Sequence, residues 1–513
     1  MPKQALYTDA AYKKLKSGID KLAEAVTSTL GPNGKNVLIQ GFDGNPVVTK
    51  DGVTVARHFD LEDPVERLGM SIVREASYKV NKVGDGTTTT TLLAKEITDI
   101  VPEGDVHQFR RDIQKHSDEV CAYLDSIAVP VDSEEMLAKV ATISANNDPV
   151  LGATVAKVVW DVGKDGVVTV EEWAGTDIQT EKVEGFQIKN GYIAREMVTN
   201  LERMECVLND VAVLVTDKKI SSVADVLPLM EKVATGFGGT VSPAKQLVII
   251  ADDIEGDALG TLVINKFRAG FVTLAVRAPS LAFRQESLKD LAAMLGATLI
   301  SDENALKLDS VKPEDLGRAK KVTATKDTTT FIGGAGTEEA IKQCLNEIDL
   351  ELAKPNVSEY NREKLYERKA RLTGGVAIIR VGAYSESELK ERKFLVDDSV
   401  AAAKAALDGG IVAGGGVALA RASANVPGKL KDILLAPVLR IGGVDCLKHD
   451  AATNEGFDAK AGVFVPDMIA AGIIDPVKVV KSTLQNAVSV ASMLLTTNAV
   501  LYDEPEKSVC HQK

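Results

Sequence analysis

The segment GDGTTTTTLLA (84–94) joins a glycine loop to a stretch whose apolar spacing predicts a helix. Gly84 and Gly86 leave room for the backbone to approach a ligand. The first N–H groups of a helix are unpaired and carry the positive end of its dipole, so they suit phosphate oxygens. Asp85 would repel a bare phosphate, but Mg²⁺ binds carboxylate and phosphate oxygens together. The segment therefore predicts a phosphate and Mg²⁺ site.

Three further segments carry the same kind of residues: TLGPNGKNV (29–37), TKDGVTVA (49–56) and VDDSVAAAKAALDGGIVAGGGVAL (396–419). Two of these segments contain an aspartate, Asp51 and Asp398, whose carboxylate could bind Mg²⁺ or orient an attacking water. Taken singly these signals are weak, since a DG pair is usually a turn and GGG is often a flexible loop. The Walker pattern GxxxxGK[ST] is absent, so a nucleotide site here is of another kind. Together the segments predict one site built from both ends of the chain.

The order of elements predicts a nested domain organisation. An amphipathic helix is expected before Gly31-Pro32, from the spacing of Leu15, Ile19, Leu22 and Val26. The segment around Asp398 must return to this helical unit, so that unit is discontinuous in sequence. The middle of the chain has short apolar runs typical of buried strands at 211–217, 246–253, 271–279 and 298–303. They alternate with helical patterns near 221–234, 255–269 and 284–296, which predicts a parallel sheet with right-handed crossovers. No GxGxxG follows these strands, so a dinucleotide site is not expected.

Length and composition exclude several classes of protein. The 513 residues suggest about three domains. A net charge of −13 argues against nucleic-acid or anionic-membrane partners. The sequence has no apolar run of about 18 residues and starts with neither a signal nor a transit pattern, so we expect a cytoplasmic protein. Its five cysteines and five histidines show no disulfide or metal-ligand spacing, so free thiols and no zinc are expected.

Taken together, the sequences of these segments resemble those of the group I chaperonins of the GroEL type. The stretches that carry the resemblance are TLGPNGKNV, VTKDGVTVARHFDLEDPVERLGMSIV, GDGTTTTTLLA, TISANND, DKKIS, KDTTTFI, REKLYERKARLTGGVAIIRVG, GIVAGGGVALA and AGIIDPVKV. They occur in the family's order between about Tyr12 and Tyr502. The sequence is thus identified as a divergent member of this family, and its departures leave a virus-encoded origin open.

The resemblance implies a multidomain α/β and α subunit with the chaperonin fold. An α-helical equatorial ATPase domain would comprise 1–126 and 409–513, and a small hinged intermediate domain 127–183 and 376–408. An apical domain with the parallel βαβ core, 184–375, would bind unfolded protein. In the family, seven subunits form rings around a cavity, and ATP binding and hydrolysis drive assisted folding inside it.

The resemblance also implies roles for individual residues in binding ATP with Mg²⁺, with K⁺ as a further candidate ion. Asp85 would hold Mg²⁺, and Asp398 would act on the attacking water with assistance from Asp51. The nucleotide would be lined by Thr29, Leu30, Gly31, Pro32, Lys50, Gly86, Thr87, Thr88, Thr89, Gly414, Gly415, Asp458, Ala459, Ile473 and Asp475. Asp458 replaces the family's usual asparagine, which keeps an acceptor but removes a donor and puts base selectivity in doubt.

Clients would bind an apolar surface in the apical domain. Its expected residues are Tyr192, Met197, Leu227, Met230, Leu259, Val263 and Ile264. On periodicity alone such a stripe is usually core, so only the resemblance predicts its exposure. Glu196 lies where the family has an aromatic residue, which should weaken the capture of apolar segments and leaves the use of a lid co-chaperonin open. The loop 236–245 is also expected to be longer than the family's.

Two segments through which rings of the family contact each other are short here, 97–112 and 421–455. We therefore expect single or weakly stacked double rings, in the host cytoplasm if the protein is virus-encoded. The family's glycine- and methionine-rich tail is expected to be missing after EPEKSVCHQK (504–513). Two other classes of function stay open: a ring-forming scaffold with weak or no foldase activity, and a small-molecule phosphotransferase using the same Mg²⁺ site.

Overall fold

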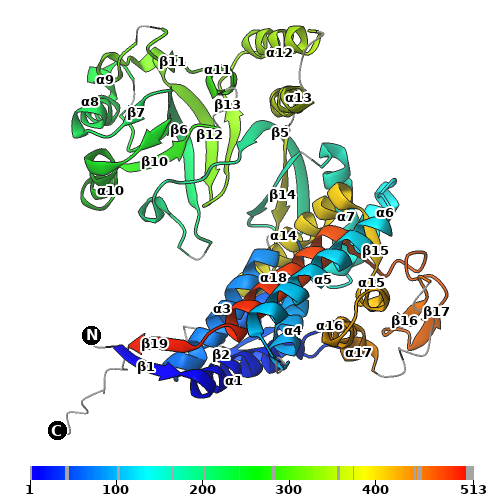
Figure 1. Ribbon diagram of the computed structural model, residues 1–513. Helices are drawn as coiled ribbons and strands as arrows, with labels where there is room; N and C mark the ends of the chain where they lie inside the picture. Colours follow the sequence, from blue (N-terminus) through cyan, green and yellow to red (C-terminus); the bar gives the residue numbers. More distant parts are fainter. Residues whose placement is uncertain are drawn as a thin grey trace. The chain divides into compact units, whose positions relative to one another are not determined.

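The computed structural model describes residues 3–40, 46–81, 83–100, 104–164, 166–201, 203–241, 243–279, 284–304, 306–354, 359–373, 375–443, 446 and 453–503. These residues form two compact units (Figure 1). The first unit comprises Met1–Lys164, Val170–Gln179 and Arg380–Lys513, and the second comprises Asp165–Thr169 and Thr180–Ile379. The first unit is discontinuous in sequence and holds most of the expected equatorial and intermediate residues, so a division into three domains stays a prediction.

The first unit is mainly helical. Its helices are α1 (Thr8–Thr27), α2 (Gly52–His58), α3 (Pro64–Asn81), α4 (Thr87–Thr98), α5 (Val106–Ser126), α6 (Glu134–Ser144), α7 (Pro149–Val162), α14 (Glu386–Gly409), α15 (Val417–Ala422), η4 (Ser423–Asn425), α16 (Lys429–Leu434), α17 (Ala436–Gly442) and α18 (Val477–Leu495). Four two-stranded antiparallel sheets accompany them in the described residues: β1 (Lys3–Tyr7) with β19 (Ala499–Asp503), β2 (Val37–Gln40) with β3 (Pro46–Thr49), β15 (Ile411–Ala413) with β18 (Ile474–Pro476), and β16 (Gly456–Asp458) with β17 (Val463–Val465).

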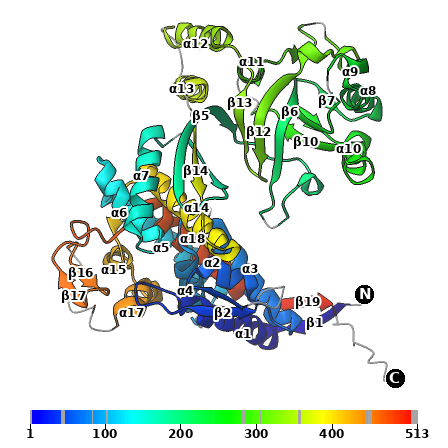
Figure 2. The ribbon, with the colours of Figure 1, turned by 180° about the vertical axis from the view of Figure 1, so that it is seen from behind.

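Helices α1, α3, α4, α5 and α18 pack around one apolar core (Figure 2). The expected N-terminal stripe of Leu15, Ile19, Leu22 and Val26 lies in that core. Close approach of α1 and α3 requires glycine on both helices: a Cβ at Gly18 would lie 2.0 Å from the Glu66 carbonyl oxygen, and one at Gly69 would lie 2.1 Å from that of Leu15. The core therefore fixes α4, whose first turn follows the GDG loop.

The second unit is built on a mixed sheet. Its parallel part contains β6 (Cys206–Thr216), β8 (Gln246–Ala251), β10 (Val272–Arg277) and β11 (Leu299–Ile300), connected by α8 (Val223–Ala234), α10 (Gly256–Ala269) and α11 (Arg284–Leu295). The predicted βαβ core is confirmed. Alternate strand residues face opposite sides, so Val248 and Ile250 pack with the α11 side while Leu247 and Ile249 pack with the α8 and α10 side.

Sequence patterns alone did not indicate the other strands of this sheet, among which β12 pairs antiparallel with β6 and β13, and β13 pairs antiparallel with β5. The full strand order is β10-β8-β6-β12-β13-β5-β14-β4, with β11 beside β6. The additional strands are β4 (Val167–Glu172), β5 (Ile178–Ile188), β12 (Gly317–Ala324), β13 (Thr329–Gly334) and β14 (Gly375–Val381). The sequence of β12, GRAKKVTA, alternates exposed and buried residues rather than forming an apolar run.

Shorter elements and two further helices complete the second unit. They are η1 (Arg195–Met197), β7 (Lys219–Ile220), α9 (Gly236–Gly239), β9 (Asp253–Ile254), η2 (Leu308–Ser310), η3 (Pro313–Asp315), α12 (Glu338–Leu352) and α13 (Glu359–Thr373). A buried bidentate ion pair joins α13 to α11, with Arg368 Nε 2.7 Å from Asp290 Oδ2 and Arg368 Nη2 2.9 Å from Asp290 Oδ1. Within the described ranges, none of the helices combines the length and apolarity needed to cross a bilayer.

Candidate active site

The GDG loop lies where α3 ends and α4 begins, as its sequence predicts. Gly84 has φ +145°, which favours glycine. A Cβ at Gly86 would lie 2.6 Å from Val80 Cγ1 and 2.7 Å from Thr483 Oγ1. No larger residue fits here without displacing its neighbours, and Gly86 as the N-cap leaves the first N–H groups of α4 without a side-chain hydrogen bond.

The threonine run divides into a structural part and an accessible part. Thr90 Oγ1 donates to the Gly86 carbonyl at 2.9 Å, and Thr91 Oγ1 donates to that of Thr87 at 2.9 Å. Thr87 is also buried, so its backbone N–H is the group it can offer to a ligand. Thr88 and Thr89 are only partly buried. A Cβ at Gly52 would lie 2.2 Å from Thr88 Oγ1, so the start of α4 lies directly against the start of α2.

Carboxylates from four segments influence one another at this place. Desolvation, followed by the charges of Asp51 and Asp475, raises the pKa of Asp85 to about 6. The Asp85 side chain is nevertheless open to solvent, so water relieves part of the desolvation and the neighbouring carboxylates account for the direction of the shift. Burial, followed by the charges of Asp85, Asp51 and Asp397, raises the pKa of Asp398 well above its usual range. The fold thus places Asp51, Asp85 and Asp398 near enough for their charges to act on one another.

Asp51 is the N-cap of α2. Its Oδ1 accepts from the Val53 N–H at 3.0 Å, and its Oδ2 accepts from the Thr54 N–H at 2.7 Å and from Thr54 Oγ1 at 2.6 Å. These bonds satisfy the helix end and fix the orientation of the carboxylate. A supporting rather than a leading role in chemistry agrees with this arrangement.

Asp398 lies on α14 and contacts a residue that the sequence did not indicate. Asn81 Nδ2 donates to Asp398 Oδ1 at 3.2 Å. Asn81 is the last residue of α3 and thus lies close before the GDG loop. In the sequence, only its position next to the GDG motif could have indicated that Asn81 belongs to the site, because 317 residues separate it from Asp398.

The triple glycine and Asp475 also meet. Strand β15 pairs with β18, with Val412 opposite Asp475. The Gly414 N–H donates to the Ile473 carbonyl at 2.9 Å, and a Cβ at Gly414 would lie 2.9 Å from the Ile474 nitrogen. The Gly415 N–H donates to the Asp475 side chain, while burial raises the pKa of that carboxyl to about 6.

The first glycine loop is tied to the KDG segment. Lys50 Nζ donates to the Pro32 carbonyl at 3.1 Å. Thr29 is buried and its Oγ1 donates to the Val26 carbonyl at 2.8 Å, while Leu30 N–H donates to that of Thr27 at 3.2 Å. Gly31 has φ +76°, which suits the turn after α1.

The pair Asp458-Ala459 joins the same loop through Asn33, whose Nδ2 donates to the Ala459 carbonyl at 3.0 Å. Asp458 Oδ1 accepts from the N–H groups of Lys460 at 2.8 Å and Ala461 at 3.0 Å. These contacts require only an acceptor. The structure therefore explains how a carboxylate replaces the amide of the family pattern.

Magnesium fits this donor set in one specific way. Among the described residues, no three metal-ligating side chains converge on one point. Mg²⁺ commonly takes one or two carboxylates and completes its shell with substrate phosphates and water. Asp85, open to solvent beside the start of α4, suits such a single protein ligand.

The expected client surface is only partly exposed. Met197, at 1% exposure, and Met230, at 4%, lie in the core between the sheet and α8 and α10, so neither is a surface residue in this conformation. Leu227 is 40% exposed and Ile264 is 50% exposed. The other expected residues, Tyr192, Leu259 and Val263, are partly buried.

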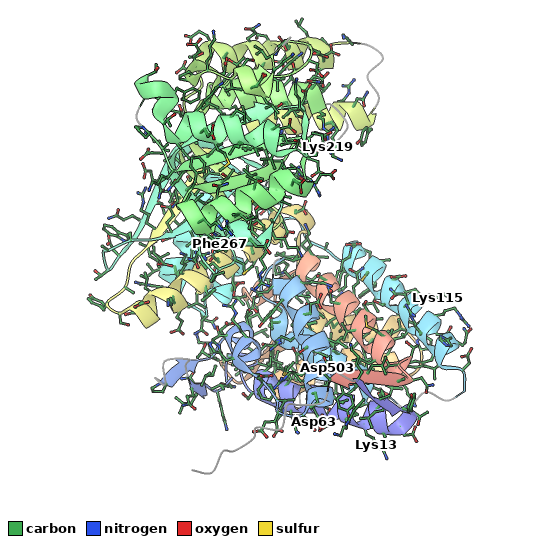
Figure 3. The ribbon with its side chains drawn as sticks, turned by 90° about the vertical axis from the view of Figure 1, so that its left-hand side faces the viewer. Lys13, Asp63, Lys115, Lys219, Phe267 and Asp503 are labelled. Atoms are coloured by element: carbon green, nitrogen blue, oxygen red, sulfur yellow. The ribbon has the colours of Figure 1, made fainter. Side chains whose placement is uncertain are left out.

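Phe267 on α10 is a surface residue that sequence analysis missed. It is 70% exposed and lies one helical turn after Ile264 on α10. Figure 3 labels Phe267. Glu196 is exposed, and its carbonyl accepts from Lys266 Nζ at 2.7 Å. An apolar surface on α8 and α10 is thus bordered by a carboxylate and a lysine.

Several expectations fall partly outside the described residues. These are the short segments 97–112 and 421–455, the loop 236–245, the end of the sequence at 504–513 and Cys510. Cys121, Cys206 and Cys344 are free thiols, as expected.

A family model described as the TCP-1/cpn60 chaperonin family matches residues 22–433. The chain belongs to the TCP-1/cpn60 chaperonin family. Among solved structures, it is similar to the chaperonin gp146 from the bacteriophage EL 2 (Pseudomonas aeruginosa), crystallised in presence of ATP-BeFx. Crystal form II matches with a TM-score of 0.75 at 22% identity, over 98% of this chain and 99% of that chain. Crystal form I matches with a TM-score of 0.66 at the same identity and coverage. The expected chaperonin fold is confirmed.

Proposed function

We propose that this chaperonin binds and hydrolyses ATP with Mg²⁺ and uses the cycle to assist the folding of unfolded proteins. The observation that carries the proposal is that α2, the GDG loop and α14 adjoin one another, so that the charges of Asp51, Asp85 and Asp398 act on one another beside the start of α4. Neighbouring carboxylates repel one another, which raises their pKa values and costs stability. Such an arrangement is more often found at a functional site, where a bound cation offsets the repulsion. The crystals of the phage EL chaperonin with an ATP analogue support a nucleotide as the ligand.

The roles of the residues follow from their positions. The start of α4 and Gly86 would receive phosphate oxygens, and Gly414 and Gly415 would face the nucleoside, with Asp475 accepting from ribose hydroxyls. Lys50, Ile473 and the residues 29–32 would line the remaining nucleotide surface. Asp85 would hold Mg²⁺, which supplies positive charge to the phosphates when it is bound.

Asp398 would orient and deprotonate the attacking water, with Asp51 in support. In hydrolysis the water oxygen bonds to the γ-phosphorus while the bond from that phosphorus to the β–γ bridging oxygen breaks. The electron pair leaves with ADP, and the proton of the water passes to the Asp398 carboxylate. A base must be ionised to do this, and positive charge near Asp85 favours ionised Asp398.

Self-assembly into a ring is supported by exposed apolar residues on the small sheets of the first unit. Leu38 in β2 is 71% exposed and Leu501 in β19 is 62% exposed. Two-stranded ribbons leave unpaired edges that can add strands from another copy of the chain. We infer a homo-oligomeric ring, with seven subunits as in the family and with one ring or two weakly stacked ones.

The first test is the native particle mass of the protein without nucleotide, with ADP and with ATP. Ring-sized masses would support the proposal and would show whether one ring or two persist. A subunit-sized mass in every condition would refute a cavity mechanism and favour the phosphotransferase.

ATP turnover distinguishes the remaining alternative. Ring-sized particles that bind ATP without hydrolysing it would instead favour a scaffold. Stimulation of turnover by an unfolded protein, rather than by a metabolite, is the result expected of a foldase.

A further inference from the structure

Asp398 is held at two points one helical turn apart on α14. At the first point, Asn81 Nδ2 donates to Asp398 Oδ1 at 3.2 Å. At the second, the Arg57 guanidinium carbon lies 5.2 Å from the centre of the Phe394 ring. Arg57 belongs to α2, the helix capped by Asp51, and Asn81 ends α3. Helices α2 and α3, which both adjoin the GDG loop, therefore both contact α14, the helix that carries Asp398.

The Asn81 side chain is poorly explained as a stabilising residue. In the ionised form that a base requires, Asp398 can only accept, so the amide turns its nitrogen to Asp398. Its Oδ1 is then buried and has no hydrogen-bond partner among the described residues. A buried acceptor without a partner costs free energy, so stability alone does not account for asparagine here.

Other contacts hold α14 in place without these two residues. Lys393 Nζ lies 2.7 Å from Glu172 Oε1, and Ser399 Oγ lies 3.2 Å from the Ala141 carbonyl. Removing Asn81 or the Phe394 ring should therefore leave the helix attached. What would change is the placement of one carboxylate.

We propose that Asn81 and Phe394 are positioning residues for ATP hydrolysis, which hold Asp398 at the attacking water. This inference rests on the proposed function. Asn81 sets the direction of the carboxylate by its hydrogen bond, and the ring of Phe394 fixes the preceding helical turn through Arg57. Neither residue needs to touch the nucleotide.

The first experiment compares Asn81→Ala with Asn486→Ala, a control whose amide donates to Ser482 of its own helix at 2.8 Å. Asn81→Ala should lower kcat about ten- to a hundredfold, as expected for a lost hydrogen bond to a charged group. The KM for ATP, the Kd for a non-hydrolysable ATP analogue, the Tm and the native particle mass should stay close to wild type. Asn486→Ala should leave kcat unchanged.

A double variant separates positioning from other effects. In an Asp398→Ala background, adding Asn81→Ala should lower kcat by no more than about twofold, because a residue that acts through Asp398 has nothing left to position. An equal loss in both backgrounds would overturn the proposal, and so would wild-type kcat in the single variant. Absence of ATP turnover in the wild type would instead refute the proposed function itself.

Phe394→Leu tests the second point independently, should Asn81→Ala fail to fold. Leucine keeps apolar volume and removes the aromatic face, so kcat should fall about two- to tenfold with unchanged ATP affinity. The matched control is Tyr360→Leu, since Tyr360 also carries a cation over its ring, with Lys364 Nζ 5.8 Å from the ring centre. Equal kcat in Phe394→Leu and Tyr360→Leu would overturn the role of Phe394.

Discussion

The candidate sites of the two units hold different kinds of side chain that cost stability. At the candidate site of the first unit they are carboxylates whose charges act on one another, with the pKa of Asp85 raised to about 6 and that of Asp398 raised well above its usual range. At the candidate client surface of the second unit they are exposed apolar side chains, such as Phe267 at 70% exposure. Each kind marks a surface that awaits a partner. The proposed partner of the first unit is a nucleotide phosphate with its cation, and that of the second unit is an apolar segment of an unfolded protein.

The largest effect that sharpens this comparison should come from Asp398→Ala. Loss of the group that acts on the water should slow ATP turnover about 10²- to 10⁴-fold. ATP affinity and capture of an unfolded protein by the second unit should persist. Single-turnover hydrolysis and equilibrium binding of ATP measure the two parts separately. Asp397→Ala, on the neighbouring residue of α14, is the control and should change turnover only a few-fold; wild-type turnover in Asp398→Ala would remove its role.

Asp85→Asn should produce the next largest effect. The amide keeps the shape of the side chain but lacks the charge that a hard cation requires. ATP affinity in the presence of Mg²⁺ should fall at least about tenfold, whereas affinity in the presence of EDTA should be no lower than in the wild type, because the amide does not repel a bare phosphate. Titrations of ATP with and without Mg²⁺ test this. Equal Mg²⁺ dependence in both proteins would show that the cation binds elsewhere.

Phe267→Glu should affect the second unit alone. A charge on the exposed face of α10 should weaken capture of an unfolded model protein about three- to tenfold, with ATP turnover in the absence of client unchanged. Leu350→Glu is the matched control, because Leu350 is also 70% exposed but lies on α12. Equal losses in the two variants would mean that apolar exposure in general, rather than the surface on α8 and α10, attracts clients.

Local patterns predicted much of both units. The apolar spacing in α1 and the glycine loop before α4 were readable because neighbours in sequence determine them. The antiparallel strand β12 was not, because its polar residues alternate with buried ones and only pairing with β6 and β13 stabilises them. Strand pairing between distant segments is a property of the tertiary fold.

The candidate site shows the same limit. Asp51 and Asp85 could be predicted because each lies next to glycine in a recognisable motif. Asn81 and Phe394 lie in no such motif, and their proposed role depends on the contacts of α14 with α3 and α2 in the folded protein. Met197 was expected on the surface from the resemblance, yet its side chain fills the core beside Leu214 and Ala275. Burial depends on packing that no local pattern encodes.

The smallest effect concerns pH and has opposite signs for the carboxyls of the candidate active site and for Asp253 in the second unit. Without Mg²⁺, Asp85 and Asp475 have pKa values of about 6 in the folded state, above the ordinary value of 3.8. Between these values the folded state binds protons that the unfolded state has lost, so these groups lower the free energy of unfolding as pH rises from about 4 to 6. In the second unit, burial of Asp253 raises its pKa, but the hydrogen bond and the charge of Arg277 outweigh burial, so the pKa of Asp253 is lowered. Asp253 therefore stabilises the folded state near neutral pH, and this stabilisation is lost as the pH falls.

Thermal unfolding from pH 4 to 7, with and without Mg²⁺, tests this difference. Mg²⁺ should raise the Tm more at pH 7 than at pH 5, because at pH 7 it meets an ionised Asp85. Asp85→Asn should reduce both the Mg²⁺ effect and the loss of stability between pH 4 and 6, whereas Asp253→Asn should leave the Mg²⁺ effect intact. If Asp85→Asn and wild type gave the same pH dependence, the raised pKa of Asp85 would have no counterpart in the stability of the protein, and the cost we assign to gathering these carboxylates would have to lie with Asp398 and Asp475.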